Sequence, residues 1–275
     1  MPELPETETI ARDLDAEIRG RVVTGVVVRR ADVLREVDAA GLGARVVGAT
    51  IERCWRRAKL VVIDLDRGDR IVVQPRFTGA LLLSRGPLPA EEAPYSTLHF
   101  ALDDGRDLHY RDIRRLGTVA LMGPARFAEY DAGLGVEPLD PTFSAEHLSA
   151  LLRGSRQPVK KVLMDQRVLV GIGNIYANEA CWRAGVDPSR AARDVEAPEA
   201  ARLHAGITSV LRESIAARGT SFRDYRDASG GRGDFERSLA AYGRGGEPCL
   251  RCGARLVETH AIDGRTTVLC AGCQR

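Results

Sequence analysis

Short runs of β-branched and other apolar residues, separated by turn sequences, fill residues 21–125 of the chain. The turn sequences include DRGD at 66–69 and DDG at 103–105, which are typical of chain reversals between strands. This spacing predicts an antiparallel β-sandwich or barrel. The strand-like runs are RVVTGVVV at 21–28, LVVIDL at 60–65, RIVVQ at 70–74 and LHFAL at 98–102.

Apolar residues recur at helical spacing at the start of the chain and again after residue 144. Ile10, Leu14 and Ile18 share one face of a predicted N-terminal helix. Pro5 suits the first turn of that helix, and Gly20 its end. The later helices are predicted at 144–154 with Ser144 as N-cap, from 157 onward, at 174–185 between the N-cap Asn174 and the stop Gly185, and at 197–219.

These patterns predict an α+β chain of several domains. A helix and an antiparallel sandwich occupy 1–125, and a Pro- and Gly-containing linker follows at 126–143. Helices occupy 144–240, and a small cysteine-containing module forms 241–275. Residues 220–238, which are rich in Gly and Arg, are predicted to be a mobile loop.

The composition is that of a protein with ordinary folded cores, because 44% of its 275 residues are hydrophobic and 28% are charged. No apolar run reaches the length of a membrane span, and the acidic N-terminus lacks an apolar signal segment. We therefore expect a cytoplasmic protein without a membrane partner. The net charge is only +2, but residues 151–275 hold 20 Lys+Arg against 14 Asp+Glu, so the C-terminal half is the basic one.

Four cysteines near the C-terminus form two pairs of equal spacing. Cys249 and Cys252 are followed, after 17 intervening residues, by Cys270 and Cys273. Two such pairs can close a tetrahedral zinc–thiolate site, and four thiolates leave no position open for a substrate. We therefore expect one structural Zn²⁺ here, because a module of this size has too small a core to fold unaided.

The remaining signals near these cysteines are less specific. Cys54 and Cys181 lie far from the module and are predicted to be small buried residues. Within the module, Asp263-Gly264 indicates a hairpin turn, and Arg265 follows it directly. An arginine at such a tip either enters a DNA groove or is simply solvated.

A second candidate site precedes the helix at 174–185. Gly171 and Gly173 bracket a tight turn, and free N–H groups at the start of the helix could bind a phosphate. Packing between helices, with Asn174 acting only as a cap, explains the same residues equally well.

Six motifs follow one another along the chain: PELPE at 2–6, RRAK at 56–59, DIRRLG at 112–117, MDQRVLVGIGNIYANEA at 164–180, YGRGGEPC at 242–249 and the cysteine module with Arg265. In this order they resemble the formamidopyrimidine-DNA glycosylase and endonuclease VIII family of base-excision repair enzymes. The resemblance covers essentially all 275 residues. It implies an N-terminal helix and β-sandwich, a helical domain with a helix–two-turn–helix, and a four-cysteine zinc-finger β-hairpin.

The resemblance gives the N-terminal acids and prolines a chemical role. Without it, Pro2 and Glu3 are explained by the start of a helix. With Met1 removed, Pro2 resembles the family's amine nucleophile, Glu3 its proton donor and Glu6 a supporting acid. An α-amino group has a pKa near 8, so roughly a tenth of it is neutral and nucleophilic at about pH 7.

Other roles are implied residue by residue. Lys59 matches a lysine that contacts the phosphate beside the lesion and donates a proton in β-elimination. Arg265 matches a finger arginine that binds phosphate and assists the second elimination. The DNA-binding positions implied by the resemblance are Phe77, Arg114 and Leu116, which would fill the space of a displaced nucleotide, and Lys160, Asn174 and Tyr242.

The sequence departs from the family pattern at several positions. QPRFTG at 74–79 stands where HLGMSG is usual, so Gln74 replaces a phosphate-contacting His and Phe77 replaces Met. Leu116 replaces Phe, and Tyr95 is nearest to the place of a missing His. These changes leave Pro2 and Glu3 in place, but they leave the choice of lesion open.

The favoured function is that of a glycosylase and lyase acting on damaged double-stranded DNA. It would remove oxidised purines, namely 8-oxoguanine and formamidopyrimidines, and cleave the strand by β,δ-elimination. We expect a monomer that associates with the nucleoid through DNA. The alternatives are an endonuclease VIII-like preference for oxidised pyrimidines, and a zinc-dependent DNA-binding protein without catalysis.

Overall fold

The computed structural model describes residues 2–221 and 225–275, which form two compact units. The first unit contains Met1–Ala132 and Ala217–Glu236, and the second contains Gly133–Ala216 and Arg237–Arg275. The sequence placed 217–236 with the helices of 144–240, whereas these residues pack in the first unit. The predicted linker at 126–143 contains most of a helix, α3 (Pro124–Ala132).

The first unit begins with the predicted N-terminal helix, α1 (Leu4–Ile18). Its N-cap is Glu3, and the Glu6 carboxylate accepts a hydrogen bond from the Glu3 N–H at 2.7 Å, which satisfies one of the backbone donors at the helix start. Ile10, Leu14 and Ile18 are fully buried. The helix ends before Gly20, as predicted, where φ is +78°.

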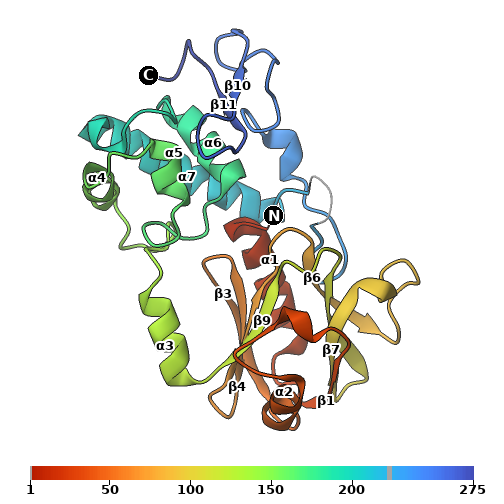
Figure 1. Ribbon diagram of the computed structural model, residues 1–275. Coiled ribbons are helices and arrows are strands. Elements are labelled where there is room, and N and C mark those ends of the chain that lie inside the picture. Colours follow the sequence, from red (N-terminus) through yellow and green to blue (C-terminus); the bar gives the residue numbers. More distant parts are fainter. Residues whose placement is uncertain (1, 222–224) are drawn as a thin grey trace. The chain divides into compact units, whose positions relative to one another are not determined.

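Two sheets form the sandwich of the first unit, seen in the lower part of Figure 1. The pairing is antiparallel except between β2 and β9, which confirms the predicted sandwich. One sheet has the order β2-β9-β5-β4-β3 and consists of β2 (Leu34–Arg35), β3 (Ile51–Arg57), β4 (Leu60–Leu65), β5 (Arg70–Gln74) and β9 (Thr118–Met122). The other has the order β1-β7-β8-β6 and consists of β1 (Val23–Val28), β6 (Gly79–Arg85), β7 (Ser96–Leu102) and β8 (Arg106–Asp112).

A single apolar core joins α1 to the facing sides of both sheets. Alternate residues of each strand point into it, such as Val61 and Ile63 of β4 and Leu98 and Phe100 of β7. Tyr225 also lies in this core, so residues 217–236 belong to the first unit through burial of apolar surface as well as through contact. A short helix, α2 (Ala39–Val46), adds further apolar side chains.

Seven of the described residues between 220 and 238 are buried and seven are exposed, and the mobility predicted for this stretch stays a prediction. Tyr225, Asp227 and Phe235 are all buried, and a short 3₁₀ turn spans Phe235–Ser238. Residues 222–224 of this stretch lie outside the described residues.

The second unit is mainly helical, with a small hairpin. Its helices are α4 (Ala145–Arg153), α5 (Val159–Met164), α6 (Asn174–Ala184) and α7 (Ala197–Ala216), and its hairpin pairs β10 (Val257–Thr259) with β11 (Thr267–Leu269). Ser144 caps α4 by accepting from the His147 N–H, as predicted. The helices α6 and α7 pack closely because Gly206 has no side chain: a Cβ there would lie 3.0 Å from the Ala180 carbonyl oxygen.

Two details of the helical prediction are wrong. The N-cap of α6 is Gly173, and Asn174 is its first helical residue. The helix predicted from residue 157 ends already at Met164. It ends there because the Gln166 side chain stabilises a turn, donating to the carbonyls of Met164 and Ile172 at 2.9 Å each and accepting from the Gly171 N–H at 2.8 Å.

Candidate functional site

The N-terminal residues of the first unit are buried and hydrogen-bonded around Glu6. Pro2 is buried, and Glu3 is only 2% exposed. The Glu6 carboxylate accepts from two backbone N–H groups, that of Glu3 at 2.7 Å and that of Thr220 at 2.8 Å. The Tyr225 hydroxyl lies 3.4 Å from the Glu6 carbonyl. Glu6 therefore joins the start of α1 to residues 217–236.

Lys59 lies in the tight turn between β3 and β4 and is 9% exposed. The preceding Ala58 has a φ of +54°, which this turn requires. Arg56 holds the turn: it donates to the Ala58 carbonyl at 3.1 Å and pairs with Glu8 of α1 at 2.8 Å. The hairpin that carries Lys59 is thus fixed to the same helix that Pro2 and Glu3 precede.

The three side chains that the sequence assigned to the space of a displaced nucleotide are exposed. Phe77 is 46% exposed and Leu116 is 40% exposed, unusually high values for apolar side chains. The Arg114 guanidinium lies over the Phe77 ring, 5.1 Å from its centroid. Two separate loops, between β5 and β6 and between β8 and β9, therefore present these side chains together.

A buried carboxylate, Asp112, connects those two loops. It accepts from the Gly117 N–H at 2.8 Å and the Arg114 N–H at 3.3 Å in one loop, and from the Thr78 hydroxyl in the other. The Tyr110 hydroxyl adds a further bond at 3.3 Å. The approach depends on Gly117, since a Cβ there would lie 1.9 Å from the Tyr110 hydroxyl oxygen.

The positions that depart from the family pattern lie near these loops. Gln74 ends β5, and its side-chain oxygen accepts from Arg76 at 3.2 Å. Tyr95 is exposed, and the Arg111 guanidinium lies 5.7 Å from its ring centroid.

In the second unit, Lys160 lies behind the finger hairpin. It is only 1% exposed, and its Nζ donates to the Thr266 carbonyl and to the Thr267 hydroxyl, both at 2.7 Å. Those two residues directly follow Arg265, which is itself exposed. The Asp263-Gly264 turn has the expected positive φ values of +59° and +66°, and the Arg265 N–H closes it by donating to the Ile262 carbonyl at 3.2 Å.

The start of α6 offers polar atoms of its own. The side-chain oxygen of Asn174 is buried and has no hydrogen-bond donor among the residues that the structure describes. One turn later, Asn178 donates to the Asn174 carbonyl at 2.6 Å and accepts from the Val268 N–H at 2.8 Å. Asn178 therefore joins α6 to β11 of the hairpin.

Tyr242 is positioned by the fully buried Glu179 of α6. The Glu179 carboxylate accepts from the N–H groups of Ala240, Ala241 and Tyr242, the latter two at 2.8 Å. Burial raises the pKa of Glu179, and the three N–H donors oppose that effect. The stretch that connects 217–236 to the finger is thus organised around one carboxylate.

The four module cysteines gather as predicted. Their Sγ atoms all lie within 4.8 Å of one another, and those of Cys252 and Cys270 are 3.4 Å apart. Four sulfurs at about 2.3 Å from a common centre would lie nearly this close. Burial alone would raise the pKa of Cys249, but hydrogen bonds from the N–H groups of Arg251 and Trp182 lower it. Burial and the neighbouring sulfurs raise the pKa of Cys270 and Cys273. The cluster fits a tetrahedral metal ion, and Cys54 and Cys181 are buried elsewhere, as predicted.

Sequence reasoning overlooked four polar residues that position the others. Asp112, Asn178 and Glu179 all lie inside the quoted motifs, yet their acceptor roles depend on backbone atoms that are distant in sequence. A buried acid on a helix otherwise rich in small and apolar residues was the signal for Glu179. Arg218 lies in no motif, and no local pattern indicates that it contacts acids.

Two family models match the chain. The formamidopyrimidine-DNA glycosylase N-terminal domain matches residues 1–119, and the formamidopyrimidine-DNA glycosylase H2TH domain matches residues 134–226. A formamidopyrimidine-DNA glycosylase of Roseiflexus sp. (strain RS-1) is 39% identical over 278 residues, covering 100% of both chains. The chain belongs to the formamidopyrimidine-DNA glycosylase family.

Solved structures agree with this assignment. The Lactococcus lactis formamidopyrimidine-DNA glycosylase (Fpg) in a complex with DNA containing N7-benzyl-Fapy-dG matches with a TM-score of 0.91 and 29% identity, covering 100% of both chains. The Fpg of Thermus thermophilus matches with a TM-score of 0.87 and 34% identity, covering 99% of this chain and 98% of the other. The expected α+β fold of the formamidopyrimidine-DNA glycosylase family is therefore confirmed.

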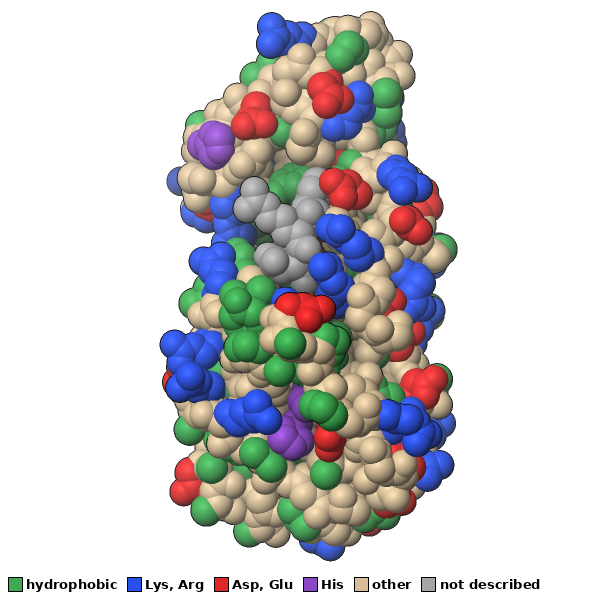
Figure 2. All heavy atoms as spheres, turned by 90° about the vertical axis from the view of Figure 1, so that its right-hand side faces the viewer, with side chains coloured by type: hydrophobic (Ala, Val, Ile, Leu, Met, Phe, Trp, Pro, Cys, Tyr) green, Lys and Arg blue, Asp and Glu red, His purple; other side chains and the backbone are tan. Residues whose placement is uncertain are grey.

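The charged groups on the surface are mixed in sign, as the small net charge of the sequence leads one to expect. On the face that Figure 2 presents, Lys and Arg side chains are interspersed with Asp and Glu. Across the described part of the chain, no helix is both long enough and apolar enough to cross a bilayer.

Proposed function

We propose that this protein removes oxidised purines from double-stranded DNA, 8-oxoguanine and formamidopyrimidines in particular, and then cleaves the damaged strand. The observation that carries the proposal is the arrangement of Pro2 and Glu3 at the start of a capped helix, with Glu6 accepting the Glu3 N–H. The names of its relatives, and the lesion-containing DNA in the Lactococcus lactis complex, support this substrate class.

The reaction begins once Met1 is removed and Pro2 carries a free secondary amine. The neutral amine attacks C1′ of the damaged deoxyribose, and the C1′–N bond to the base breaks as the base takes up a proton and the amine loses its own. The sugar ring then opens at the C1′–O4′ bond, O4′ takes up a proton, and an iminium ion forms between Pro2 and C1′. Departure of the base develops positive charge at C1′, so a neighbouring carboxyl that moves the proton lowers the barrier. Glu3, one residue from the amine in the sequence, is proposed for that role.

Strand cleavage follows from the iminium ion. The iminium acidifies the C2′ proton, so the 3′ phosphate leaves by β-elimination, and a second elimination releases the 5′ phosphate. Lys59 is proposed to contact the phosphate beside the lesion and to donate the proton of the first elimination. Arg265 is proposed to bind phosphate and to assist the second, and its exposed place at a rigid turn suits that contact.

Base removal requires the nucleotide to leave the stack, and other side chains must then fill its place. Phe77, Arg114 and Leu116 are proposed for this role because they are exposed and two of them already contact each other. An aromatic ring at Phe77 can still insert between bases. Asn174 and Tyr242 are proposed to contact the strand. The resemblance also implied Lys160 as a DNA contact, but its side chain is 1% exposed and donates to Thr266 and Thr267, so we propose that it supports the hairpin that carries Arg265.

The cofactor, assembly and location complete the proposal. One Zn²⁺ held by Cys249, Cys252, Cys270 and Cys273 would stabilise the finger, with no part in the chemistry. The protein is proposed to act as a monomer in the cytoplasm, associated with the nucleoid through DNA.

Borohydride trapping on a duplex with one abasic site tests the reaction type. We expect a covalent adduct whose modified residue is Pro2, in a polypeptide from which Met1 has been removed. A protein that binds DNA without trapping would be the non-catalytic zinc protein instead. Full activity with Met1 retained would contradict the amine mechanism.

Cleavage of duplexes with single defined lesions tests the substrate. We expect faster release of 8-oxoguanine and formamidopyrimidines than of oxidised pyrimidines. The reverse order would identify an endonuclease VIII-like enzyme and reject the purine preference.

A further inference from the structure

Arg218 occupies a conformation that its residue type disfavours. Its φ is +61°, in the left-handed region, and Gly219 follows with φ +86°. This region is strained for a non-glycine residue, so other contacts must hold Arg218 there. These two residues direct the chain so that the next N–H, that of Thr220, reaches the Glu6 carboxylate at 2.8 Å.

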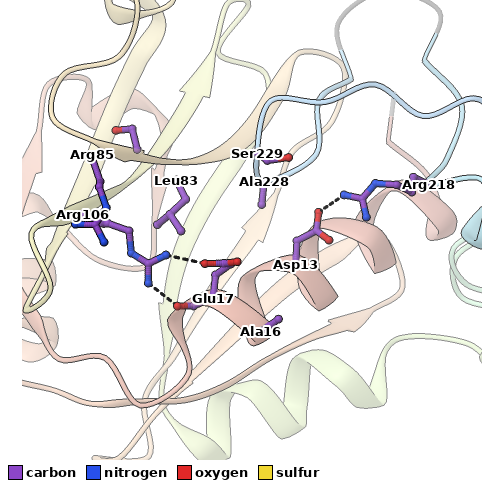
Figure 3. Close-up of a pocket in the computed structure, with 10 residues that line it drawn as sticks. Asp13, Ala16, Glu17, Leu83, Arg85, Arg106, Arg218, Ala228 and Ser229 are labelled. Atoms are coloured by element: carbon purple, nitrogen blue, oxygen red, sulfur yellow. Dashed lines mark hydrogen bonds and ion pairs between the residues drawn. The ribbon is translucent and has the colours of Figure 1, made fainter.

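Two carboxylates hold the Arg218 side chain. Its Nη2 lies 2.6 Å from Asp13 and 2.6 Å from Asp227, and its Nε lies 3.2 Å from Asp227. These bonds raise the pKa of Arg218 above its already high ordinary value. Figure 3 shows the Asp13–Arg218 pair at the edge of a hollow of about 400 Å³ beside α1.

Asp227 is itself fixed, so Arg218 is held against a rigid partner. Asp227 is 3% exposed and accepts from the N–H groups of Ser229 and Gly231, at 3.1 and 2.6 Å, and from the Ser229 hydroxyl at 2.8 Å. Burial alone would raise the pKa of Asp227, but the Arg218 bond and these donors lower it. The carboxylate therefore stays charged.

Asp13 and Glu6 lie on the same face of α1, because seven residues are close to two helical turns, or about 10 Å along the axis. Both contact the same short segment, Asp13 through the Arg218 side chain and Glu6 through the Thr220 N–H. The segment between these two points packs tightly against Glu6, because a Cβ on Gly219 would lie 2.9 Å from Cγ of Glu6. A displacement of Arg218 would therefore also displace the Thr220 N–H that binds the Glu6 carboxylate.

We propose that Arg218, bound between Asp13 and Asp227, is a positioning residue for the catalytic N-terminus. By fixing Thr220 on Glu6, it keeps the Glu6 carboxylate on the Glu3 N–H, and so holds Glu3 and Pro2 where they react. Arg218 itself touches no reacting atom in this scheme. The inference rests on the proposed function, because it takes Pro2 and Glu3 as the reacting groups.

The test uses the full-length protein and the variant Arg218→Met, which keeps the side chain's length and removes its charge. Adduct formation with a duplex containing one abasic site is measured by borohydride trapping at saturating enzyme. We expect trapping to slow by about tenfold, because small misplacements of reacting groups cost this much or more. The dissociation constant for the same duplex should stay within about twofold, since no DNA contact is removed.

Arg106→Met is the matched control. Arg106 lines the same hollow and also binds two acids, Asp104 and Glu17 of α1; Figure 3 shows the bonds to Glu17. Among the described residues, Arg106 has no hydrogen bond or ion pair with Glu6 or with the segment that follows α7. It should trap at the wild-type rate. Arg218→Lys should recover most of the rate, because a single nitrogen of Arg218 reaches both carboxylates and one ammonium can replace it.

Several outcomes would overturn the proposal. Trapping by Arg218→Met at the wild-type rate, or a loss confined to DNA affinity, would do so. So would slow base release together with normal trapping, because that pattern would place Arg218 in base recognition.

If Arg218→Met does not fold, Asp13→Asn replaces it. Trapping by Asp13→Asn is expected to slow by about threefold, since Asp227 still binds Arg218; no slowing would overturn the proposal. Failure of the wild-type protein to trap would reject the proposed function instead.

Discussion

Glu6 receives two backbone N–H groups, one on each carboxylate oxygen, at 2.7 and 2.8 Å. It is 1% exposed, so neither donor has water as a substitute partner. The symmetry of a carboxylate matters here, because an amide presents one acceptor oxygen and one NH₂ group. Both carboxylate oxygens of Glu6 are thus needed to hold the site together, apart from any part that Glu6 plays in the reaction.

Glu6→Gln tests this requirement. One backbone N–H would face an amide NH₂, so we expect the free energy of unfolding to fall by about 2 kcal/mol and trapping on abasic DNA to slow. Chemical denaturation measures the first effect. Glu17→Gln, on the exposed end of the same helix, should change stability by less than about 0.5 kcal/mol. Equal effects of the two variants would contradict the role given to Glu6.

His109 predicts a pH dependence unrelated to catalysis. It lies directly opposite His99 in the β7–β8 pair, with ring centroids 4.9 Å apart. Burial, and then the charge of His99, lower the pKa of His109 from 6.5 to about 4. Because the unfolded chain binds this proton near pH 6.5 and the folded chain only near pH 4, the stabilisation is complete above pH 6.5 and is lost as the pH falls toward 4.

Denaturant unfolding at two pH values measures this effect. Between about pH 7.5 and about pH 5, the wild-type protein should lose about 2 kcal/mol more than His109→Gln does. An identical loss in both proteins would show that His109 is protonated in the folded state.

At the scale of elements, Asp112 makes one unit of the loops that carry Phe77 and Arg114. Its oxygens accept from both loops, and the Thr78 hydroxyl also accepts from the Arg114 N–H at 3.0 Å. The buried hydrogen bonds of Asp112 and Thr78 therefore hold the two loops whose exposed side chains include Phe77 and Arg114.

Asp112→Asn should disturb this support while leaving Pro2 untouched. We expect base release from a lesion in duplex DNA to slow by about tenfold, with a smaller effect on trapping by single-stranded abasic DNA, where no stacked partner must be replaced. Asp107→Asn, on the same strand, serves as the control. Equal slowing on both substrates would mean that Asp112 acts on the chemistry.

Elements with strong local patterns could be predicted from the sequence. The apolar runs predicted β4, β5 and β7, and Ser144 marked the start of α4 correctly. The end of α5 could not be predicted, because it depends on the Gln166 side chain reaching a carbonyl six residues away. The N-cap at Gly173 was missed since asparagine is the commoner cap.

Site residues divided along similar lines. The family resemblance gave Pro2 its predicted chemistry, which stays a prediction. The regular spacing of the cysteines predicted their cluster, which the structure confirms. Asp112, Glu179 and Arg218 bind groups that only the tertiary structure brings near, such as Ala240 against Glu179. The roles of these three residues therefore could not be predicted from the sequence.

At the scale of the whole molecule, we expect the finger to depend on the zinc ion proposed for its four cysteines. Its own core is small, consisting of Ala241, Leu256, Val268 and two of the cysteines. Cys270→Ser should therefore release zinc and abolish DNA binding, because binding of the metal supplies the folding free energy. Metal analysis and gel-shift titration measure both effects, and Cys54→Ser should retain the metal. Unchanged affinity in Cys270→Ser would refute the structural role.

The first unit is assembled from two stretches that are distant in the chain, since Ala217–Glu236 joins Met1–Ala132. During synthesis, the strands of the sandwich leave the ribosome long before Thr220 and Tyr225 are made. Until then, Glu6 of α1 lacks one of its two hydrogen-bond donors, and the part of the core that Tyr225 covers is exposed. The surroundings of Pro2, the proposed nucleophile, are thus completed only when nearly the whole polypeptide has left the ribosome. We expect nascent or truncated chains to carry Pro2 without the contacts from residues 217–221 and 225–236 that hold the start of α1.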